Sequence, residues 1–341
     1  MRSNALTKKP RSMPVAIVPA AGVGTRLRPQ THTVPKALVN VAGKPILGHI
    51  LDALLDQGIT SIKVVVGYMG ERIEEYIRER YRKNIDVIEQ SERLGLGHAI
   101  AVTAPHVPAG PVLIVLGDTI VEPEWSDYLS GDEAVIGVKE VEDPRRFGVV
   151  EVRGDTALRL VEKPSEPLSN LAIVGLYYFP DSVALFKSLR TLVKGGSKTK
   201  GEFQLTDALQ SMLENGMRMR VSTVEGWFDC GKPETLLETN QHLLRKVPQP
   251  TPIPGVTLVP PVFVAPTARI EKSILGPNVS VADGAVIRRT IVRDSIVNEH
   301  ALVEDMLLER SVVGESAVVR GVFQRLNVGE SSAVDLSGGS F

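Results

Sequence analysis

The sequence predicts an α/β domain followed by a short β-helix, and three observations support this prediction. Strand-like apolar runs alternate with helical patterns over the first two-thirds of the chain. Alternate prolines at 247–261 separate this region from the remainder. Beyond them, aliphatic residues recur about every six positions. We therefore expect a Rossmann-like, mixed and mainly parallel sheet flanked by helices, and then a solenoid of short strands.

The α/β domain is predicted from the order of its segments. Apolar runs at 15–18, 62–66, 85–88, 112–116, 134–138 and 173–179 predict strands. Apolar residues at three-to-four spacing predict helices over 46–55 and 73–81. Such alternation favours parallel strands with right-handed crossovers, whose ligands bind at the carboxyl ends of the strands. The loop at 19–36 and the turn at 116–118 both follow expected strands, so we place the site there.

The solenoid is predicted from contiguous hexads such as 275–280 and 281–286. Aliphatic residues such as Leu275 and Val281 are expected to point inward, with small residues at the tight corners. A β-sandwich is the alternative, but its strands would alternate with period two. The predicted organisation is a flexible basic tail at 1–12, a catalytic domain at 13–246, a Pro-rich linker at 247–261 and the β-helix at 262–336.

The composition limits the classes of function. The 341 residues are 43% hydrophobic and 23% charged, with a net charge of −1, which argues against nucleic acid as the main partner. The single cysteine, Cys230, excludes an intrachain disulfide, fits a reducing cytoplasm and is expected to be an inert filler. No apolar run reaches the roughly 18–20 residues that span a bilayer, and the tail lacks the apolar core of a signal peptide.

The loop Gly22-Val-Gly-Thr-Arg26, with Lys36 ten residues beyond it, is a candidate phosphate cradle. Gly22 and Gly24 let backbone N–H groups approach phosphate oxygens, because no Cβ intervenes. Arg26 and Lys36 supply positive charge. The pattern is neither the P-loop nor the dinucleotide motif. A glycine-rich turn alone is often only a turn, and the two cations favour the cradle.

Two carboxylates stand at strand ends. Asp118 follows the apolar run at 112–116, and Asp229 lies at a strand-to-helix junction whose helix begins near Pro233. Each is as compatible with capping a turn or helix as with binding a cation. Together with bridging phosphates they suffice for Mg²⁺, which keeps several waters.

Further candidates have weaker signals. Glu162 and Lys163 follow a strand-like run and suit a sugar hydroxyl and a phosphate, although a surface salt bridge is the commoner interpretation. Gln90 and Gly95 resemble a base-reading loop, because an amide both donates and accepts, although a polar loop is the simpler alternative. His98 is expected to pack at a helix end.

Taken together, these segments resemble the sugar-1-phosphate nucleotidyltransferase family, and in particular its long-form glucose-1-phosphate thymidylyltransferases, which carry a C-terminal left-handed β-helix. The resemblance extends from about 14 to 335. The matching segments, in order, are Ala21-Gly-Val-Gly-Thr-Arg-Leu27, Pro35-Lys36, Gly95-Leu96, Leu116-Gly-Asp118, Arg146-Phe-Gly-Val-Val150, Glu162-Lys-Pro164, Val174-Gly-Leu-Tyr-Tyr178, Gly201-Glu-Phe-Gln-Leu-Thr-Asp207 and Gly226-Trp-Phe-Asp229 with Gly231-Lys-Pro-Glu234.

The resemblance implies the nucleotidyltransferase fold and a role for each candidate. The implied catalytic residues are Arg26, Lys36, Asp118 and Lys163. The implied nucleotide-binding residues are Ala21, Gly22, Gly24, Thr25, Gln90 and Gly95. Gly148, Glu162 and Val174 would line the sugar site, and Asp118 and Asp229 would hold Mg²⁺.

The implied reaction transfers a nucleotidyl group from a nucleoside triphosphate, dTTP or UTP, to a sugar 1-phosphate, with glucose 1-phosphate favoured. Pro19-Ala20 and the segment Gly95-Leu-Gly-His-Ala99 depart from the usual thymidylyltransferase pattern, as does Cys230 where Thr is frequent. The departures leave the nucleotide open, so GTP with mannose 1-phosphate and UTP with N-acetylglucosamine 1-phosphate remain alternatives.

Other function classes are weaker. A nicotinamide oxidoreductase lacks its glycine motif, and a bifunctional acyltransferase would rely on His300, the only histidine beyond 246. A nucleotide-sugar sensor is the non-enzymatic alternative. We expect a cytoplasmic homo-oligomer with the β-helix at an interface and no membrane or nucleic-acid partner.

Overall fold

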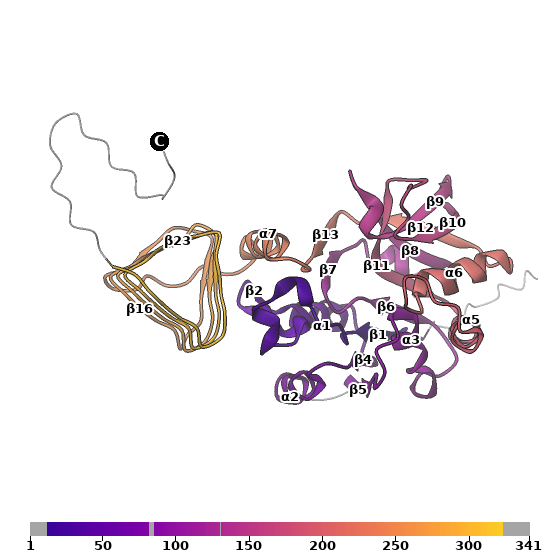
Figure 1. Ribbon diagram of the computed structural model, residues 1–341, viewed down its shortest axis with the longest axis horizontal. Helices are drawn as coiled ribbons and strands as arrows, with labels where there is room; N and C mark the ends of the chain where they lie inside the picture. The colour runs from indigo at the N-terminus through magenta and orange to yellow at the C-terminus, as the bar shows by residue number, and fades with distance from the viewer. Residues whose placement is uncertain (1–11, 82–84, 130, 323–341) are drawn as a thin grey trace, which may run out of the picture. The chain divides into compact units, whose positions relative to one another are not determined.

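The chain divides into two compact units, Met1–Val247 and Pro248–Phe341. The computed structural model describes residues 12–81, 85–129 and 131–322 (Figure 1). All but the last residue of the expected tail at 1–12 lies outside the described residues, as does the end of the β-helix segment beyond 322. Each unit is described by itself below.

The first unit is built on a nine-stranded mixed sheet with the order β5-β4-β1-β6-β11-β8-β12-β10-β9 (Figure 1). In that order the strands are Ile85–Glu89, Ile62–Val66, Val15–Pro19, Val112–Val115, Leu171–Phe179, Ala134–Glu140, Met219–Thr223, Thr156–Glu162 and Gly148–Arg153. The first four run parallel, and β11 is antiparallel to both of its neighbours in the order. Every expected strand forms, and the predicted α/β class is confirmed.

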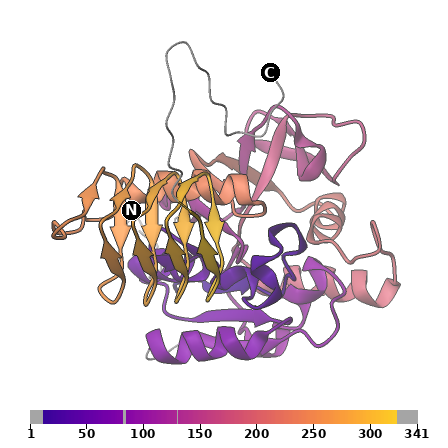
Figure 2. The ribbon, with the colours of Figure 1, turned by 60° about the vertical axis from the view of Figure 1, so that its left-hand side comes forward.

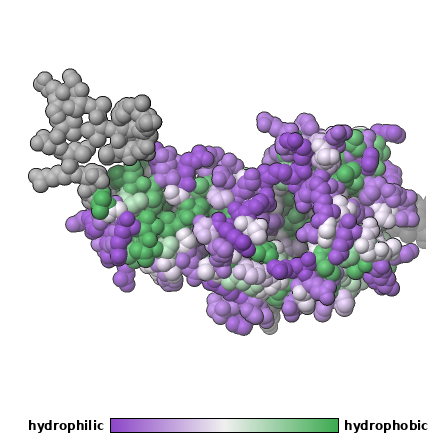
Figure 3. All heavy atoms as spheres, viewed as in Figure 1, coloured by the Kyte–Doolittle hydropathy of each residue, from purple (hydrophilic) through white to green (hydrophobic). Residues whose placement is uncertain are grey.

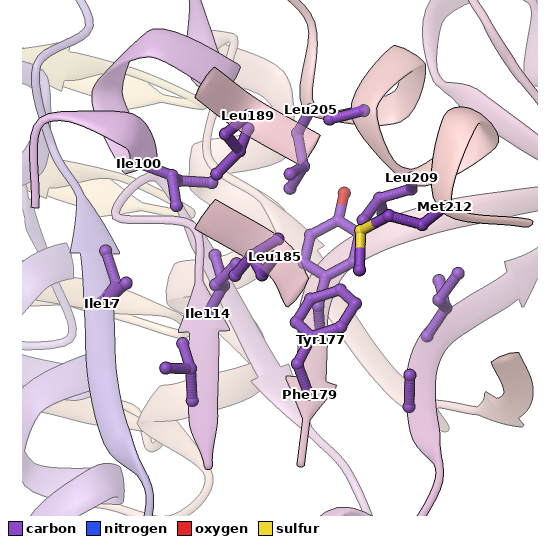
Figure 4. Packing of buried hydrophobic residues seen from close by; sticks show 14 of the residues in the cluster. Ile17, Ile100, Ile114, Tyr177, Phe179, Leu185, Leu189, Leu205, Leu209 and Met212 are labelled. Atoms are coloured by element: carbon purple, nitrogen blue, oxygen red, sulfur yellow. The ribbon is translucent and has the colours of Figure 1, made fainter. Parts of the chain in front are cut away.

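Helices flank the sheet because apolar residues at helical spacing form one face of each helix, and this face packs against the sheet. They are α1 Ile46–Asp56, α2 Gly70–Arg80, α3 Leu96–Ala101, α4 Ser126–Leu129, α5 Ser182–Gly195, α6 Leu205–Glu214 and α7 Pro233–Leu244. Figure 4 shows the core between sheet and helices, with Ile17, Ile114 and Phe179 from strands facing Leu185 of α5 and Leu205 of α6. The two predicted helices match α1 and α2.

Two separate two-stranded ribbons and short 3-10 turns complete this unit. β7 (Thr119–Glu122) pairs antiparallel with β13 (Gly226–Asp229). β2 (Asn40–Val41) pairs with β3 (Lys44–Pro45). The 3-10 turns are η1 Thr25–Leu27, η2 Gln30–His32, η3 Lys36–Leu38, η4 Ala104–His106 and η5 Pro144–Arg146.

The second unit is a β-helix of three parallel four-stranded sheets (Figure 2). The sheets are β14-β17-β20-β23, β15-β18-β21-β24 and β16-β19-β22-β25. Their strands, in chain order, are Thr257–Leu258, Val262–Val264, Arg269–Glu271, Ile274–Leu275, Val279–Val281, Val286–Arg288, Ile291–Arg293, Ile296–Val297, Leu302–Glu304, Leu307–Glu309, Val312–Val313 and Val318–Arg320. The predicted β-helix architecture is confirmed.

The coils are shorter than three full hexads. Ile274 pairs with Ile291 and Ile291 with Leu307, so successive coils are 17 and 16 residues long. One corner explains part of the shortening, because Lys272, Arg289 and Asp305 turn there with φ of 47°, 48° and 57°. The inward aliphatic residues, including Leu275, Val281, Ile287 and Val297, are fully buried as expected.

The segment at 247–261 contributes to the solenoid. β14 lies inside it and already pairs with β17. Among the described residues, no helix has the length and apolar character needed to cross a membrane.

Candidate active site

A cleft of about 370 Å³ opens at the carboxyl ends of β1, β5 and β6. The structure brings six sequence-predicted residues to its wall: Ala21, Gly22, Lys36, Gln90, Gly95 and Asp118. These residues come from four segments far apart in the sequence. Their meeting follows from the parallel pairing of β5, β4, β1 and β6, which aligns the carboxyl ends of these strands at one edge.

Gly24 shapes the loop that follows β1. Its φ is 68°, a left-handed value that side chains with a Cβ adopt at a cost. A Cβ at this position would lie 2.8 Å from Lys36 Cβ. The hydroxyl of Thr31 donates a hydrogen bond to Gly24 O at 2.8 Å and fixes the turn. Gly24 therefore leaves room for Lys36, while Thr25 and Arg26 stay exposed beyond it.

Lys36 and Asp118 meet in the cleft. Lys36 Nζ lies 2.6 Å from Asp118 Oδ2, and Lys36 is only 6% exposed. The Asp118 side chain keeps 41% of its surface exposed, which leaves it accessible to a ligand. Burial alone would raise the pKa of the Asp118 carboxyl, but the Lys36 ammonium, the Thr119 hydroxyl and Arg26 lower it below its usual value. Asp118 is therefore a carboxylate at neutral pH.

The β7–β13 ribbon brings Asp229 beside this pair. Asp229 is paired with Thr119, the residue after Asp118, and Cys230 N donates to Asp118 O at 3.2 Å. A Cβ at Gly231 would lie 2.7 Å from Arg26 Nη2 and 2.8 Å from Asp229 Oδ1, so both side chains approach this glycine. Asp118, Asp229 and Arg26 thus converge from three segments.

The donor set tests whether Mg²⁺ would fit here. In the described part of the chain, no group of three or more acidic, histidine or cysteine side chains could hold a metal. Carboxylates such as Asp118, directly before β7, and Asp229, at the end of β13, are nevertheless the oxygen ligands that Mg²⁺ takes when phosphates and waters complete its shell. The site suits a cation that arrives with a phosphorylated substrate.

Cys230 is buried next to these carboxylates. Burial raises the pKa of its thiol to about 12. Its Sγ lies 3.8 Å from Phe228 O and 3.6 Å from Thr239 Oγ1, and the single S–H can donate weakly to either oxygen. A buried thiol with a raised pKa stays protonated at neutral pH, which fits the expected role of an inert filler.

The β9–β10 hairpin gathers the candidates for the sugar. Gly148 pairs with Glu162, and a Cβ on Gly148 would lie 3.2 Å from Glu162 Oε2. Thr206 Oγ1 donates to the same oxygen at 2.6 Å. Lys163 Nζ lies 3.2 Å from Glu162 Oε1, and Lys163 has a φ of 44°. Gly148, Glu162 and Lys163 therefore form one cluster.

This hairpin is joined to the strand that carries Asp229. Lys163 N donates to Phe147 O at 3.0 Å. The Phe147 ring packs edge to face on Trp227 of β13, with centroids 4.9 Å apart. Val174 lies at a bulge of β11 with its side chain buried, and it is packed toward Gly137. The assignment of Val174 to the sugar site stays a prediction.

Sequence reasoning missed residues that the cleft gathers. Arg93, Leu96 and Glu202 line it, and Thr206 orients Glu162 from α6. Glu202 and Thr206 belong to the segment 201–207 that carried part of the resemblance. The motif therefore marked these residues but did not indicate what they do. Only the tertiary contact with β10 shows what Thr206 does.

Comparison with known proteins settles the family. A family model described as nucleotidyl transferase matches residues 15–246. The chain belongs to this nucleotidyl transferase family. The match covers the whole α/β sheet and every segment that forms the cleft and the hairpin cluster.

Members of the family with known names and structures are similar to different extents. The low-salt glycan biosynthesis nucleotidyltransferase Agl11 of Haloferax volcanii is 40% identical over 66% of this chain, which spans only 64% of that relative. A glucose-1-phosphate thymidylyltransferase of Streptomyces griseus is 30% identical over 94% of this chain and 99% of its own length. The solved UDP-glucose pyrophosphorylase of Acinetobacter baumanii is 26% identical, with a TM-score of 0.58, over 70% of this chain and 95% of its own.

Proposed function

We propose that this protein transfers a nucleotidyl group from dTTP or UTP to a sugar 1-phosphate, with glucose 1-phosphate as the favoured acceptor. The observation that carries the proposal is the Lys36–Asp118 contact of 2.6 Å, placed where the nucleotide cleft meets Asp229 and Arg26. A buried cation and two carboxylates at one end of the cleft suit a triphosphate that binds with a divalent metal. The similarity to the Streptomyces griseus enzyme supports the same reaction.

The chemistry requires little beyond positioning and charge neutralisation. An oxygen of the sugar phosphate attacks the α-phosphorus and forms a new O–P bond. The bond to the bridging oxygen of the β-phosphate breaks, and pyrophosphate leaves with the electron pair. The nucleophile is already an anion, so no general base is needed, and the rate depends on in-line alignment.

Each residue has a defined task in this mechanism. The backbone at Ala21, Gly22 and Gly24 approaches the phosphates, while Thr25 and Arg26 stand at the outer side of the loop. Lys36 and Arg26 neutralise charge on the non-bridging oxygens, and Lys163 holds the sugar phosphate beside Glu162. Mg²⁺ held by Asp118 and Asp229 would supply further neutralisation of the α-phosphate.

A substrate matrix tests the proposal. dTTP, UTP, GTP, CTP and ATP are each combined with glucose, galactose, mannose and N-acetylglucosamine 1-phosphates and Mg²⁺, and pyrophosphate is measured. Release with dTTP or UTP and glucose 1-phosphate supports the proposal. Release with GTP and mannose 1-phosphate, or with UTP and N-acetylglucosamine 1-phosphate, would assign the alternative substrates. Nucleotide-sugar binding without pyrophosphate release would indicate a sensor.

Acetyl-CoA consumption with an amino-sugar phosphate would show a second, acyltransferase activity. That activity would need His300, which lies at a corner of the β-helix with its ring over Gly284.

A further inference from the structure

The side-chain amide of Gln90 makes its hydrogen bonds through its nitrogen. It follows β5, lines the cleft and is only 4% exposed. Its Nε2 lies 3.1 Å from Gly95 O and 3.0 Å from His98 Nδ1. A carbonyl oxygen only accepts hydrogen bonds, so Gly95 O requires the amide nitrogen, and not the amide oxygen, on that side. One of the two amide hydrogens is thereby used.

The second amide hydrogen determines which ring nitrogen of His98 acts as an acceptor. Since Gln90 Nε2 is a donor, His98 Nδ1 must accept. This requires a neutral imidazole with its proton on Nε2, because a protonated ring has two donors and no acceptor. Gly95 O and His98 Nδ1 therefore each accept one of the two amide hydrogens, and together they fix the orientation of the amide.

The segment that carries these two acceptors is itself fixed by backbone hydrogen bonds. Phe203 N donates to Leu94 O at 2.8 Å, and Gly97 N donates to Phe203 O at 2.8 Å. Gly95 has a φ of 105°, and a Cβ there would lie 2.7 Å from Glu202 Cβ. His98 stands within α3 directly after this segment. Its ring thus reaches Gln90 from a position that the backbone determines.

The arrangement leaves one group of Gln90 for a ligand. Within the described ranges, no residue donates a hydrogen bond to its amide oxygen, and Gln90 lines the cleft. The amide oxygen is therefore the group of Gln90 that remains to accept a hydrogen bond from a ligand in the cleft. An acceptor suits a base whose ring nitrogen carries hydrogen, as in uracil and thymine, and opposes cytosine, whose N3 has a lone pair.

We infer that His98 is a positioning residue for base selection, which rests on the proposed nucleotide site. By accepting the second amide hydrogen of Gln90, it keeps the amide oxygen directed at the base. Without that acceptor, only Gly95 O opposes rotation of the amide, so the rotated amide that offers its N–H₂ to a cytosine becomes less unfavourable. The histidine in Gly95-Leu-Gly-His-Ala99 is thus part of the selection of uracil or thymine.

Three variants separate this role from simple packing. His98→Phe keeps a ring and removes the acceptor, and His98→Leu removes both. His98→Asn places an amide oxygen near the position of Nδ1. His106→Phe, at an exposed histidine of η4, is the matched control. For each protein, kcat and KM are measured with UTP, dTTP and CTP at saturating sugar 1-phosphate.

His98→Phe is expected to lower the ratio of kcat/KM for UTP over CTP by about tenfold, on the scale of one lost hydrogen bond. The change should lie in KM for UTP and dTTP, with kcat within about threefold. His98→Asn should restore most of the ratio, and His106→Phe should leave it unchanged. Loss of kcat with an unchanged ratio would show a merely structural role.

An unchanged ratio and KM in His98→Phe would overturn the inference, and His98→Leu gives the same test if the phenylalanine variant does not fold. Calorimetric binding of UTP and CTP provides a readout independent of catalysis. Absence of pyrophosphate release by the wild type with every substrate pair would reject the proposed function. A binding preference for UTP that His98→Phe abolishes would still support the inference about His98.

Discussion

Lys36 and Asp118, which stand 82 positions apart, become neighbours only because β1 and β6 are adjacent parallel strands. The buried ammonium keeps the carboxylate ionised against the effect of burial on its pKa. The negative charge of Asp118 is thus already formed before any substrate or cation binds, and such preorganised charge is the main means by which phosphoryl-transfer sites lower barriers.

Asp118→Asn should therefore lower turnover at least about 10²-fold, the scale of losing one preorganised electrostatic group. Pyrophosphate release is the measurement. Asp155→Asn, at an exposed turn carboxylate, is the control and should retain the wild-type rate. Near-normal turnover by Asp118→Asn would refute its assignment to the reaction centre and to the metal.

The two glycines of the proposed phosphate loop should behave differently. Gly24→Ala places a Cβ at positive φ and against Lys36, so we expect a loss of about 1 kcal/mol or more in the free energy of unfolding. Gly22→Ala meets open space and should leave that free energy unchanged. Its Cβ should instead raise KM for the triphosphate, because the backbone no longer approaches the phosphates closely. Urea denaturation and steady-state kinetics separate the two effects, and equal destabilisation by both would contradict this account.

At the scale of elements, the β7–β13 ribbon determines how the proposed metal site is assembled. It pairs Asp229 with Thr119 and presents Glu122 at its other end to α7 and to the residues that directly follow this helix. Glu122 accepts hydrogen bonds from His242 Nε2 at 3.1 Å and from Lys246 Nζ at 2.5 Å. Phe228 stacks on the His242 ring at 4.2 Å. These contacts attach the β7–β13 ribbon to α7 and to the residues that follow it.

This contact makes part of the stability depend on pH. Burial would raise the pKa of Glu122, but the hydrogen bonds from Lys246 and His242 lower it below its ordinary 4.5 in the folded protein. A depressed folded pKa stabilises the protein above the ordinary pKa, and this stabilisation is lost as the pH falls through the folded value. The free energy of unfolding of wild type minus Glu122→Gln should therefore shrink from pH 7 to about pH 3, as measured by urea denaturation. A difference independent of pH would contradict the assignment.

At the scale of the whole molecule, the β-helix exposes an apolar stripe. Ile274, Ile291 and Leu307 stack on the outer face of β17, β20 and β23, and Leu307 is 72% exposed. Figure 3 shows apolar residues at the surface of this unit. Such stripes are typical of interaction surfaces. The homo-oligomer expected from the sequence remains a prediction, and this stripe is the surface at which we expect the subunits to meet.

Ile291→Lys should lower the oligomeric mass measured by light scattering, because it places a charge in the middle of the stripe. Val318→Lys, at an exposed valine of a different sheet, is the control and should leave the mass unchanged. A monomeric wild-type protein, or equal effects of both variants, would reject the interface.

The sequence alone predicted the alternation of strands and helices and the presence of the β-helix, because the spacing of apolar residues within a short segment indicates which of its faces is buried. It also named the two carboxylates, the cations and the phosphate loop, since these follow expected strands. It did not predict that the coils lose one or two residues at their corners, because left-handed turns at Lys272 and Arg289 have no strong local signal.

Only the tertiary structure decided which of these residues meet. Asp118 and Asp229 are joined by a ribbon between distant segments, Glu162 is oriented by Thr206 of α6, and His98 faces Gln90 across a loop fixed by Phe203. The physical reason is that periodicity reports burial along one element, whereas hydrogen bonds and ion pairs in a site depend on which strands pair and on their register.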